Sequence, residues 1–415
     1  MGNYKCNSVG IIGAGIQGVC IGLQLVKKGI PVTIFDKTDP GSMSSYGNAG
    51  HFSPYAVVQL NRPDVIYDIP KMLLSSYGPL ALKWNYIPKM IPWILKYLKS
   101  STKRSMLHTT KYMHQILDLS LDAYDEILNE IDTTNLVERK GIIYIWTNKN
   151  LKSRKMEIKI RNDLGIKQRL LNREEVLELE PNLSPVFDAG VIYDYAYHAR
   201  DPKEITKKLF ELFIKSGGKF KKEEVTSVEQ TRYNQTQIKT NSEKFNFEKI
   251  VLACGAFSKK LTDQLGEKIP LDTERGYHIH YKKMDHLLKR PVIFLDRGFG
   301  MTPMNQGLRA VGTVEFGGLD NPISKKRIDY IDKCAKELLP QLGDFQDEWL
   351  GFRPTLPDFL PVIGPSLKNR NIIYAFGHHH LGWTLGAITG KIVSGIVNEE
   401  KTNLDLSPYS SSRFN

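Results

Sequence analysis

The 415-residue sequence is poor in cysteine and has no long uninterrupted apolar run. Its four cysteines form no C-x-x-C pair, which argues against a structural zinc site and against a disulfide framework. No stretch reaches the ~18 consecutive apolar residues that indicate a membrane-spanning helix. Four glycines between Gly10 and Gly18 interrupt the apolar N-terminal segment, and no basic region precedes it, so we expect no signal peptide. These absences favour a cytoplasmic protein that carries no metal.

Lysine, in contrast, is abundant along the whole chain, and the formal net charge is +12. Such a charge is typical of a solvated lysine-rich surface, but it also favours contact with an anionic membrane or an anionic substrate. The basic residues form no stripe interleaved with aromatic residues, so we expect no nucleic-acid partner. Because 41% of the residues are hydrophobic, a chain of this length is expected to bury a large core and to divide into two domains.

The chain begins with the pattern of a βαβ unit. Residues 8–12 form a predicted buried strand, residues 16–28 a helix and residues 31–36 the next strand. Gly13, Gly15 and Gly18 fit the spacing G-x-G-x-x-G, in which the glycines allow a tight turn, a close approach to a pyrophosphate, and helix–strand packing. Asp36 ends the second strand, where a carboxylate can accept hydrogen bonds from ribose hydroxyls. The unit predicts a dinucleotide site; a tight turn without a ligand is the alternative.

The same unit binds FAD in some proteins and NAD in others, so the choice depends on the next segment of the chain. After the second strand the chain enters residues 44–51 (SSYGNAGH). Small residues and hydroxyls suit a loop that runs beside a diphosphate and under a flat ring, which favours FAD. A third segment, residues 377–384 (GHHHLGWT), lies near the other end of the chain. We expect both ends of the chain to hold this one cofactor.

Elsewhere the pattern alternates between helices and short strands. Apolar residues at helical spacing predict one long amphipathic helix over residues 101–131. Asp201-Pro202 has the N-cap and first helical residue of another helix, which ends near Gly217. Strands are predicted over residues 141–146 and 249–254. Residues 84–99 mix aromatic, aliphatic and lysine side chains, which suits a membrane interface or, alternatively, a helix hairpin with a buried face.

Together these segments resemble the FAD-dependent amino acid oxidoreductases, which include D-amino acid dehydrogenase, D-hydroxyproline dehydrogenase, glycine oxidase and sarcosine oxidase. The resemblance covers nearly the full length of the chain. The Asn-Ala-Gly and His-Leu-Gly-Trp-Thr stretches most resemble the D-amino acid and hydroxyproline dehydrogenase branch. The matching stretches are residues 13–18 (GAGIQG), 48–50 (NAG), 251–258 (VLACGAFS), 307–309 (GLR), 351–358 (GFRPTLPD), 361–364 (PVIG) and 377–384.

The resemblance implies an α/β fold in which a Rossmann-like FAD-binding domain joins a discontinuous α+β substrate domain, as in glycine oxidase and D-amino acid oxidase. Because the flavin segments are scattered, we expect the FAD-binding domain to comprise residues 1–75, 195–265 and 345–400. The substrate domain would then comprise residues 76–194 and 266–344, with a C-terminal tail at 401–415.

The family also implies roles for individual cofactor-binding residues. Asp36 and Lys37 would meet the adenosine ribose, and the backbone of Val225 the adenine. Ser44 and Ser45 would meet the diphosphate, residues 48–50 would lie beside the flavin ring, and residues 378–384 would close over its pyrimidine end. The complete predicted set is Gly13, Gly15, Ile16, Gln17, Gly18, Asp36, Lys37, Ser44, Ser45, Asn48, Ala49, Gly50, Val225, Gly255, Gly377, His378, Leu381, Gly382, Trp383 and Thr384.

Four residues form the predicted catalytic set. Arg353 matches the family's carboxylate-binding arginine, and its planar guanidinium suits bidentate capture of a carboxylate; pairing with an acid such as Asp358 is the structural alternative. His51 follows Asn-Ala-Gly, where family members place a residue facing the substrate. The alternative is a histidine near the flavin that only forms hydrogen bonds within the protein. His380 stands where glycine oxidase-like relatives carry a second substrate-binding arginine, which puts their substrate in doubt for this chain. Tyr277 is expected either to reach the pocket or to pack in the core.

The predicted reaction is oxidation of the C–N bond of a small amino or imino acid, of the D-amino acid or proline and hydroxyproline type, by hydride transfer to FAD. Residues 351–355 lack the cysteine with which sarcosine oxidase-like relatives bind flavin covalently, so we expect non-covalent FAD. Three successive histidines at 378–380 point in different directions, which argues against a metal site. Arg309 is expected to be structural.

The electron acceptor and the assembly are left open by the sequence. The D-amino acid dehydrogenases that the chain resembles are peripheral membrane enzymes, which implies a quinone acceptor and contact with the inner face of the cell membrane. The alternatives are an oxygen-using oxidase of N-methylated amino acids or glycine, and a flavoprotein subunit of a hetero-oligomer. A homo-oligomer is equally compatible with the sequence. A flavin domain acting on tRNA bases is a more distant alternative, which would draw on the positive charge.

Overall fold

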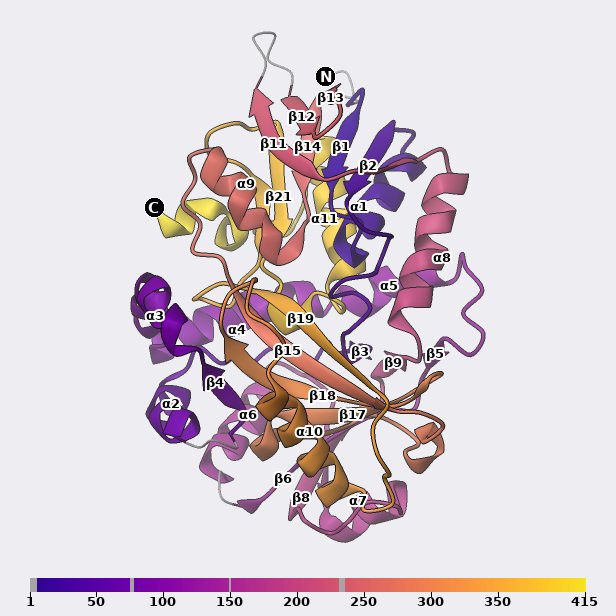
Figure 1. Cartoon of the computed structure of the whole chain (residues 1–415), viewed down its shortest axis with the longest axis vertical. Coiled ribbons are helices and arrows are strands. Elements are labelled where there is room, and N and C mark those ends of the chain that lie inside the picture. Colours follow the sequence, from indigo (N-terminus) through magenta and orange to yellow (C-terminus); the bar gives the residue numbers. More distant parts are fainter. Residues whose placement is uncertain (1–5, 75–77, 149–150, 231–235) are drawn as a thin grey trace.

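The computed structural model describes residues 6–74, 78–148, 151–230 and 236–415 (Figure 1). Its first sheet contains the N-terminal βαβ unit. Neighbouring strands in this sheet are parallel, except that β20 is antiparallel to β21. Strands from the beginning, middle and end of the chain therefore lie side by side. Their spatial order is β10 (Lys219–Lys222), β2 (Val32–Asp36), β1 (Val9–Ile12), β14 (Lys249–Leu252), β21 (Ile372–Phe376) and β20 (Val362–Pro365).

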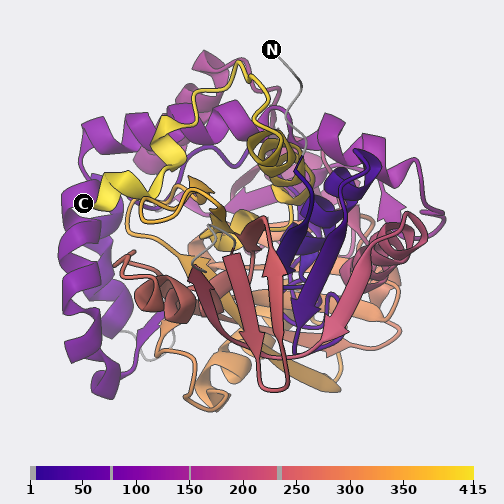
Figure 2. The same cartoon turned by 90° about the horizontal axis from the view of Figure 1, so that it is seen from above.

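This sheet is covered on both faces (Figure 2). Alternate residues of a strand point to opposite faces. Ile11 accordingly packs in the core formed with helices α1 (Ile16–Lys27), α8 (Pro202–Lys215) and α11 (Gly386–Val397). Ile12 packs on the other side, in the core shared with the antiparallel strands β11 (Val225–Gln230), β12 (Thr236–Thr240) and β13 (Lys244–Phe247). The Asp201 side chain accepts a hydrogen bond from the Glu204 N–H (3.0 Å), which confirms the predicted N-cap of α8.

A second, larger sheet lies below the first in Figure 1. Helix α10 (Lys325–Leu338) packs on this sheet, where its Ile328 and Ile331 join a core with Tyr277 and Ile279. Strand β4 (Leu80–Leu82) pairs with β18 beside the main path. That path runs β19 (Asp347–Thr355), β15 (Asp272–Tyr281), β18 (Gly307–Phe316), β17 (Phe299–Met304), β16 (Val292–Phe294), β6 (Ile142–Trp146), β8 (Ala189–Tyr193) and β7 (Arg169–Asn172).

A small antiparallel sheet connects the two regions. It consists of β3 (His51–Phe52), β9 (Tyr197–Ala199) and β5 (Val137–Glu138), with β9 in the centre. Phe52 and Tyr197 of this sheet pack in the same core as α1 and α11. The small sheet therefore holds β3, which follows the N-terminal βαβ unit, against β9 and β5 from later in the chain.

The long helix predicted over residues 101–131 is wrong in one respect: the structure has two helices there. Helix α4 spans Lys103–Leu117 and α5 spans Ser120–Leu128. At the junction, the Ser120 hydroxyl donates a hydrogen bond to the Leu117 carbonyl oxygen (2.6 Å). A serine hydroxyl that bonds a nearby carbonyl competes with the backbone ladder of a helix, and this local bond accompanies the break.

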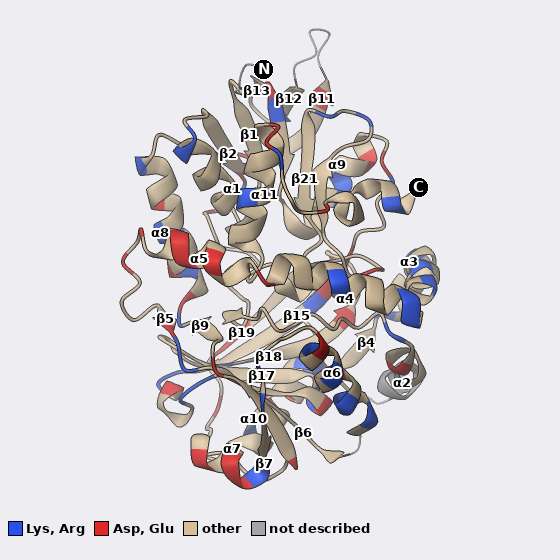
Figure 3. Cartoon of the chain, turned by 180° about the vertical axis from the view of Figure 1, so that it is seen from behind, with Lys and Arg blue, Asp and Glu red and all other residues tan. Residues whose placement is uncertain are grey.

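Helix α3 (Ile87–Ser100) follows the short helical turn η1 (Trp84–Tyr86) at the edge of the molecule. Its Met90, Trp93 and Tyr97 are buried in a small core with Phe359, while Figure 3 marks Lys and Arg positions in blue along α3 and the adjoining α4. Among the described residues, no helix is both long enough and apolar enough to cross a membrane.

The mixed α/β architecture agrees with the prediction, and the division into domains stays a prediction. One predicted domain boundary does not coincide with a sheet boundary. Strand β19 lies in the predicted FAD-binding segment 345–400, yet it pairs with β15 of the large sheet, from the pair Asp272 and Thr355 to the pair His280 and Asp347. The predicted tail packs back onto the body, because Arg413 Nε lies 2.6 Å from the Asp358 carboxylate.

Candidate functional site

The turn between β1 and α1 is packed too closely for most side chains. Gly13 has a φ of 110°, and a Cβ atom there would lie 2.5 Å from the carbonyl oxygen of Ala253. A Cβ atom on Gly18 would collide with the carbonyl oxygen of Gly13. Gly15 differs, because a Cβ atom there would meet Ser45 Oγ at 3.3 Å and Gly15 itself lines a cavity. The first and third glycines thus hold the turn on the helix, and the second opens the helix N-terminus to a ligand.

Hydrogen bonds fix this turn against its neighbours. The Ile16 N–H donates to the Ser45 hydroxyl (2.9 Å), and the Ala14 N–H donates to one oxygen of Asp36 (2.8 Å). The other Asp36 oxygen accepts from the backbone N–H and the hydroxyl of Thr38, both at 2.9 Å. The N-terminal end of a helix carries partial positive charge, so this arrangement suits a diphosphate beside Gly15.

The cavity in front of α1 has a volume of about 1180 Å³ and collects residues from all three predicted flavin segments. A glycine-lined helix N-terminus at one end of so large a cavity fits FAD. The predicted cofactor-binding residues that line it are Gly13, Gly15, Ile16, Gln17, Asp36, Lys37, Ser44, Ser45, Asn48, Ala49, Val225, Gly255, His378, Gly382 and Trp383.

Gln17 links the two ends of the chain at this cavity. Its Nε2 donates a hydrogen bond to the Gly382 carbonyl oxygen (2.7 Å). Its Oε1 is buried and has no partner among the described residues. A buried acceptor without a partner is costly, so a donor group of a bound cofactor, such as a hydroxyl, would satisfy it.

The other predicted cofactor-binding residues support the site instead of lining the larger cavity. Gly18 lets the helix pack against the turn. Gly377 has a φ of 82° at the start of residues 377–384, the late turn. Thr384 Oγ1 donates to the His51 carbonyl oxygen (3.1 Å) and accepts from the Ser53 N–H (3.1 Å). Gly50 and Leu381 line a second, smaller cavity.

The loop at residues 44–50 is held by the large sheet. Buried Arg309 on β18 donates from Nη1 to the carbonyl oxygens of Tyr46 (2.8 Å) and Asn48 (2.6 Å). Its Nε donates to Nε2 of His280 (2.8 Å). Burial lowers the pKa of Arg309 to about 10, so the side chain remains a cation at neutral pH. These bonds support the structural role expected for Arg309.

The late turn presents its three histidines to different surroundings. His378 Nε2 is 3.1 Å from Thr389 Oγ1, and the His379 ring stacks on Phe359 with centroids 4.5 Å apart. His380 opens to both cavities. Burial lowers the pKa of His378 to about 3, and burial together with the charge of Arg353 lowers that of His380 to about 4, so both rings are neutral near pH 7. Among the described residues, no three His, Cys, Asp or Glu side chains are grouped as metal ligands.

The smaller cavity, of about 240 Å³, adjoins the larger one at Arg353, which lines both. Arg353 Nη1 donates to the Thr313 carbonyl oxygen (2.9 Å). Burial lowers the pKa of Arg353, while the charge of nearby Glu274 opposes this shift. The alternative pairing with Asp358 is not found, because Asp358 binds Arg413 instead.

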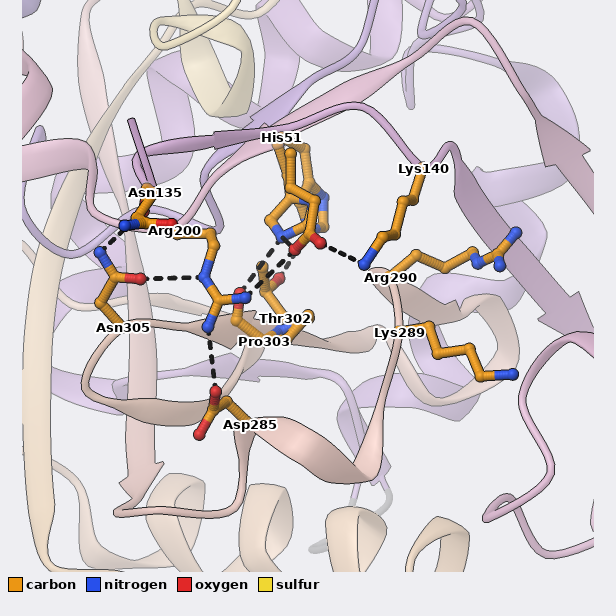
Figure 4. A network of polar contacts seen from close by, with 12 residues as sticks. His51, Asn135, Lys140, Arg200, Asp285, Lys289, Arg290, Thr302, Pro303 and Asn305 are labelled. Carbon is orange, nitrogen blue, oxygen red and sulfur yellow. Dashed lines mark hydrogen bonds and ion pairs between the residues drawn. The ribbon is translucent and has the colours of Figure 1, made fainter. Parts of the chain in front are cut away.

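His51 lines the smaller cavity, and its hydrogen bonds fix its tautomer (Figure 4). Its Nε2 lies 2.7 Å from Thr302 Oγ1, and the Thr302 hydroxyl donates to the Ala49 carbonyl oxygen (3.1 Å). A threonine hydroxyl has one hydrogen, so Nε2 of His51 must be the donor to it and Nδ1 carries the lone pair. Burial, with a contribution from His198, lowers the pKa of His51 to about 3, which keeps the ring neutral.

Tyr277 is not brought to the pocket. Its side chain is buried within the large sheet, and its hydroxyl donates to Glu315 (2.8 Å), which also pairs with Arg275 (2.9 Å). The described lining of the two cavities does not include it. The expectation that Tyr277 reaches the pocket is therefore corrected in favour of core packing, because its partner Glu315 lies on the neighbouring strand β18.

Sequence reasoning missed most walls of the smaller cavity. Strand-like runs with glycine turns over residues 291–317 were the available signal, but they do not reveal which side chains face a ligand. The missed lining residues are Ser53, Ala56, Tyr144, Ile293, Gly298, Phe299, Gly300, Val311 and Gly312.

Comparison with known proteins agrees with this geometry. Residues 8–396 match the family DAO, described as FAD dependent oxidoreductase. The chain is 32% identical to a D-amino-acid oxidase of Bradyrhizobium diazoefficiens, and the match covers 98% of each chain. It is 26% identical to a D-amino acid dehydrogenase of Vibrio atlanticus, over 97% of this chain and 99% of the relative.

Among solved structures, glycine oxidase from Geobacillus kaustophilus has the same fold, with a TM-score of 0.76 at 22% identity over 98% of this chain and 99% of the other. The predicted fold, family and FAD cofactor are therefore confirmed. This chain belongs to the DAO family of FAD-dependent oxidoreductases.

Proposed function

We propose that the chain is a dehydrogenase that oxidises the C–N bond of a small amino or imino acid, of the D-amino acid or proline type, with non-covalent FAD as the hydride acceptor. The observation that carries this proposal is Arg353, which lines both cavities and forms no ion pair with a described carboxylate. A guanidinium with donors available toward a cavity suits the carboxylate of an amino acid. The names of the D-amino-acid oxidase and dehydrogenase relatives support the same substrate class.

His51 and His380 supply neutral polar groups around the substrate nitrogen. Oxidation needs the nitrogen lone pair, because it forms the new C=N bond as the C–H hydride leaves. The lone pair on His51 Nδ1 can accept a hydrogen bond from the amine. FAD supplies the acceptor for the hydride, while Arg353 and the histidines orient the amino acid, so their contribution is mainly positioning.

The remaining wall of the smaller cavity indicates an uncharged side chain. Ile293, Phe299, Val311 and Tyr144 supply apolar surface there, and its described lining contains no aspartate or glutamate. A cationic side chain would lose its hydration without gaining a partner, and an anionic one would be held away from Arg353 by the substrate's own carboxylate.

The first test is reduction of the bound flavin by a panel of amines, followed by loss of the yellow absorbance without oxygen. We expect reduction by D-alanine, D-proline or other D-amino acids with uncharged side chains, and little reduction by D-aspartate or D-lysine. Reduction by none of the amines, N-methylglycine and glycine included, would reject the proposed activity.

Replacing Arg353, the proposed anchor for the substrate carboxylate, separates substrate binding from cofactor binding. We expect Arg353→Ala to lower kcat/KM for the best substrate by roughly 100-fold, because charge-assisted hydrogen bonds to the carboxylate are worth about 1.5–3 kcal/mol each. Arg353→Lys should restore part of the loss. FAD content, measured by absorbance, should remain unchanged, and the exposed Arg370→Ala serves as the control. Undiminished turnover in Arg353→Ala would remove the residue from this role.

The acceptor of the electrons is proposed to be a quinone at the inner face of the cell membrane. The relative named as an oxidase makes oxygen the alternative. Hydrogen peroxide formed in step with substrate oxidation would favour the oxidase, whereas turnover that requires a dye or a quinone favours the dehydrogenase.

An exposed apolar stripe on α3 supports the membrane proposal. Ile91, Leu95 and Leu98 follow one another at helical spacing and are 50%, 62% and 43% exposed. The exposed Lys96 and Lys99 flank this α3 stripe, which suits an anionic lipid surface. Lys89 of the same helix lines the larger cavity, so the stripe lies beside the rim of the flavin site.

Membrane contact through the α3 stripe can be measured by sedimentation with vesicles of phosphatidylglycerol and phosphatidylcholine. We expect Leu95→Glu to reduce the bound fraction several-fold, because it places an anion on the lipid-facing side. Leu170→Glu, at a leucine on β7 that is 53% exposed, should leave binding unchanged. Equal binding by all three proteins, or no binding by the unaltered one, would reject this surface.

The glycine turn between β1 and α1 leads to a separate prediction about the cofactor. Gly15→Ala should weaken FAD binding by about tenfold or more, because the added methyl group blocks backbone donors worth ~1.5–3 kcal/mol each to the diphosphate. The affinity is measured from the quenching of FAD fluorescence when FAD rebinds to the protein. Release of FAD when the protein is unfolded tests whether the attachment is non-covalent. Gly343→Ala, where a Cβ atom would meet nothing within 4 Å, is the matched control. Equal affinity of both variants would contradict the role of Gly15.

A further inference from the structure

Behind His51, two more titratable side chains lead away from the smaller cavity. In the small sheet, His51 of β3 pairs directly with His198 of β9, and His198 pairs with Glu138 of β5. Residues directly opposite in antiparallel strands place their side chains on the same face, with Cβ atoms about 4.5–5.5 Å apart. Two imidazoles and a carboxylate therefore form a row across three strands. This His51–Glu138 row begins at the smaller cavity, which His51 lines.

The middle of the row contains an unusual buried group. His198 is completely buried, and its Nε2 donates to the Pro303 carbonyl oxygen (3.2 Å). Its Nδ1 is buried and has no partner among the described residues. A buried lone pair without a donor costs free energy, so the group needs an explanation beyond packing.

The far end of the row is an ionic cluster at the surface (Figure 4). The Glu138 carboxylate lies 3.9 Å from His198 Nε2 and is partly exposed. It pairs with Lys140 and with Arg200 Nη1 (3.2 Å), and Arg200 Nη2 reaches Asp285 (2.9 Å). Solvent therefore meets the row at a carboxylate.

We propose that this row carries the proton of the substrate nitrogen from the cavity to solvent. The inference rests on the proposed function, because an amino acid arrives as an ammonium and must lose one proton before its lone pair is available. An N–H bond breaks and the proton passes to Nδ1 of His51. The C–H bond breaks with its electron pair as a hydride, for which bound FAD would supply the acceptor, and the nitrogen lone pair forms the C=N bond.

The proton then moves along the row. Because the Nε2–H of His51 is held by Thr302, His51 hands this proton on from the same Nδ1 atom to the unpartnered Nδ1 of His198. The Nε2 proton of His198 then leaves the Pro303 carbonyl for the Glu138 carboxylate, 3.9 Å away, which releases a proton to water. The balance is one ammonium substrate and one oxidised cofactor giving one protonated imine, one hydride on the cofactor and one proton in solvent. The His198 ring must exchange its tautomer before the next turnover.

Other acceptors around the cavity are less suited. His380 lies beside the Arg353 cation, whereas His51 is the histidine of the smaller cavity that pairs across the strands with His198. The pKa of Tyr144 is raised by burial, so its phenol is already protonated at neutral pH. Burial lowers the pKa of His198 to about 4; Glu138 and the Pro303 carbonyl favour a proton there, whereas Arg200 and Lys140 oppose it. The resting histidines are neutral, and a bound substrate carboxylate adds the negative charge that favours their transient protonation.

The test compares flavin reduction by D-alanine in unaltered holoenzyme, His198→Gln and Glu138→Gln, with His108→Gln at an exposed histidine of α4 as the control. Rates are measured by stopped flow from about pH 6 to about pH 10, and we expect both row variants to be slowed roughly 10- to 100-fold at the acid end. They should recover toward pH 10, where free amine reaches the site without needing the row. A residue that only supports the fold would slow reduction at every pH.

A second readout tracks the proton itself. In weakly buffered solution with an indicator dye, proton release should coincide with flavin reduction in the unaltered and His108→Gln proteins and lag behind it in His198→Gln. Unchanged pH profiles with simultaneous release, or uniform slowing at every pH, would overturn the proton path. Failure of the unaltered protein to be reduced by any amine would instead overturn the proposed function, and the path with it.

Discussion

The site depends on the close approach of helix α1 to the carboxyl ends of two parallel strands. Gly13 meets the backbone of Ala253 at the end of β14, and Asp36 at the end of β2 holds the Ala14 N–H. No side chain could stand between these backbones without moving the helix. The helix N-terminus, with its partial positive charge, is thereby fixed at the edge of the sheet where a diphosphate is bound best. Gln17 then joins the same helix to Gly382, so the position of the first turn determines where the late turn closes.

A second constraint couples the cofactor to the substrate anchor. The loop at residues 44–50 comes after the nucleotide-binding strands, yet its carbonyls are held by Arg309 of the large sheet. A buried guanidinium is tolerated only when acceptors surround it, so this cation and the loop fix each other. Arg353 lies on β19 of that same sheet. The large sheet consequently sets the distance between the loop predicted to lie beside the flavin and the proposed anchor for the carboxylate.

Local signals in the sequence predicted the parts of the site that depend on local backbone. The glycine spacing predicted the turn between β1 and α1, and Asp201-Pro202 predicted the start of α8. Both patterns determine the backbone conformation of only a few neighbouring residues. The parts that local patterns could not decide depend on distant partners. The Tyr277 hydroxyl donates to Glu315 of the neighbouring strand β18, which keeps Tyr277 in the core, and β19, which carries Arg353, pairs with β15 of the large sheet. Helical spacing over residues 101–131 identified the apolar face but could not show the local Ser120 bond that accompanies the break.

Burial is the main reason that the histidines around the site are neutral. The positive charge of the partly buried Arg353 adds to this effect at His380. Burial lowers the pKa of His51, His378 and His380 to about 3 to 4, so each ring offers a donor or an acceptor without adding charge. Neutral dipoles held by neighbours, such as His51 by Thr302, need little reorganisation when charge moves from the substrate. A lysine or an aspartate in the same positions would bring a full charge, and the surrounding residues would have to rearrange to compensate for it.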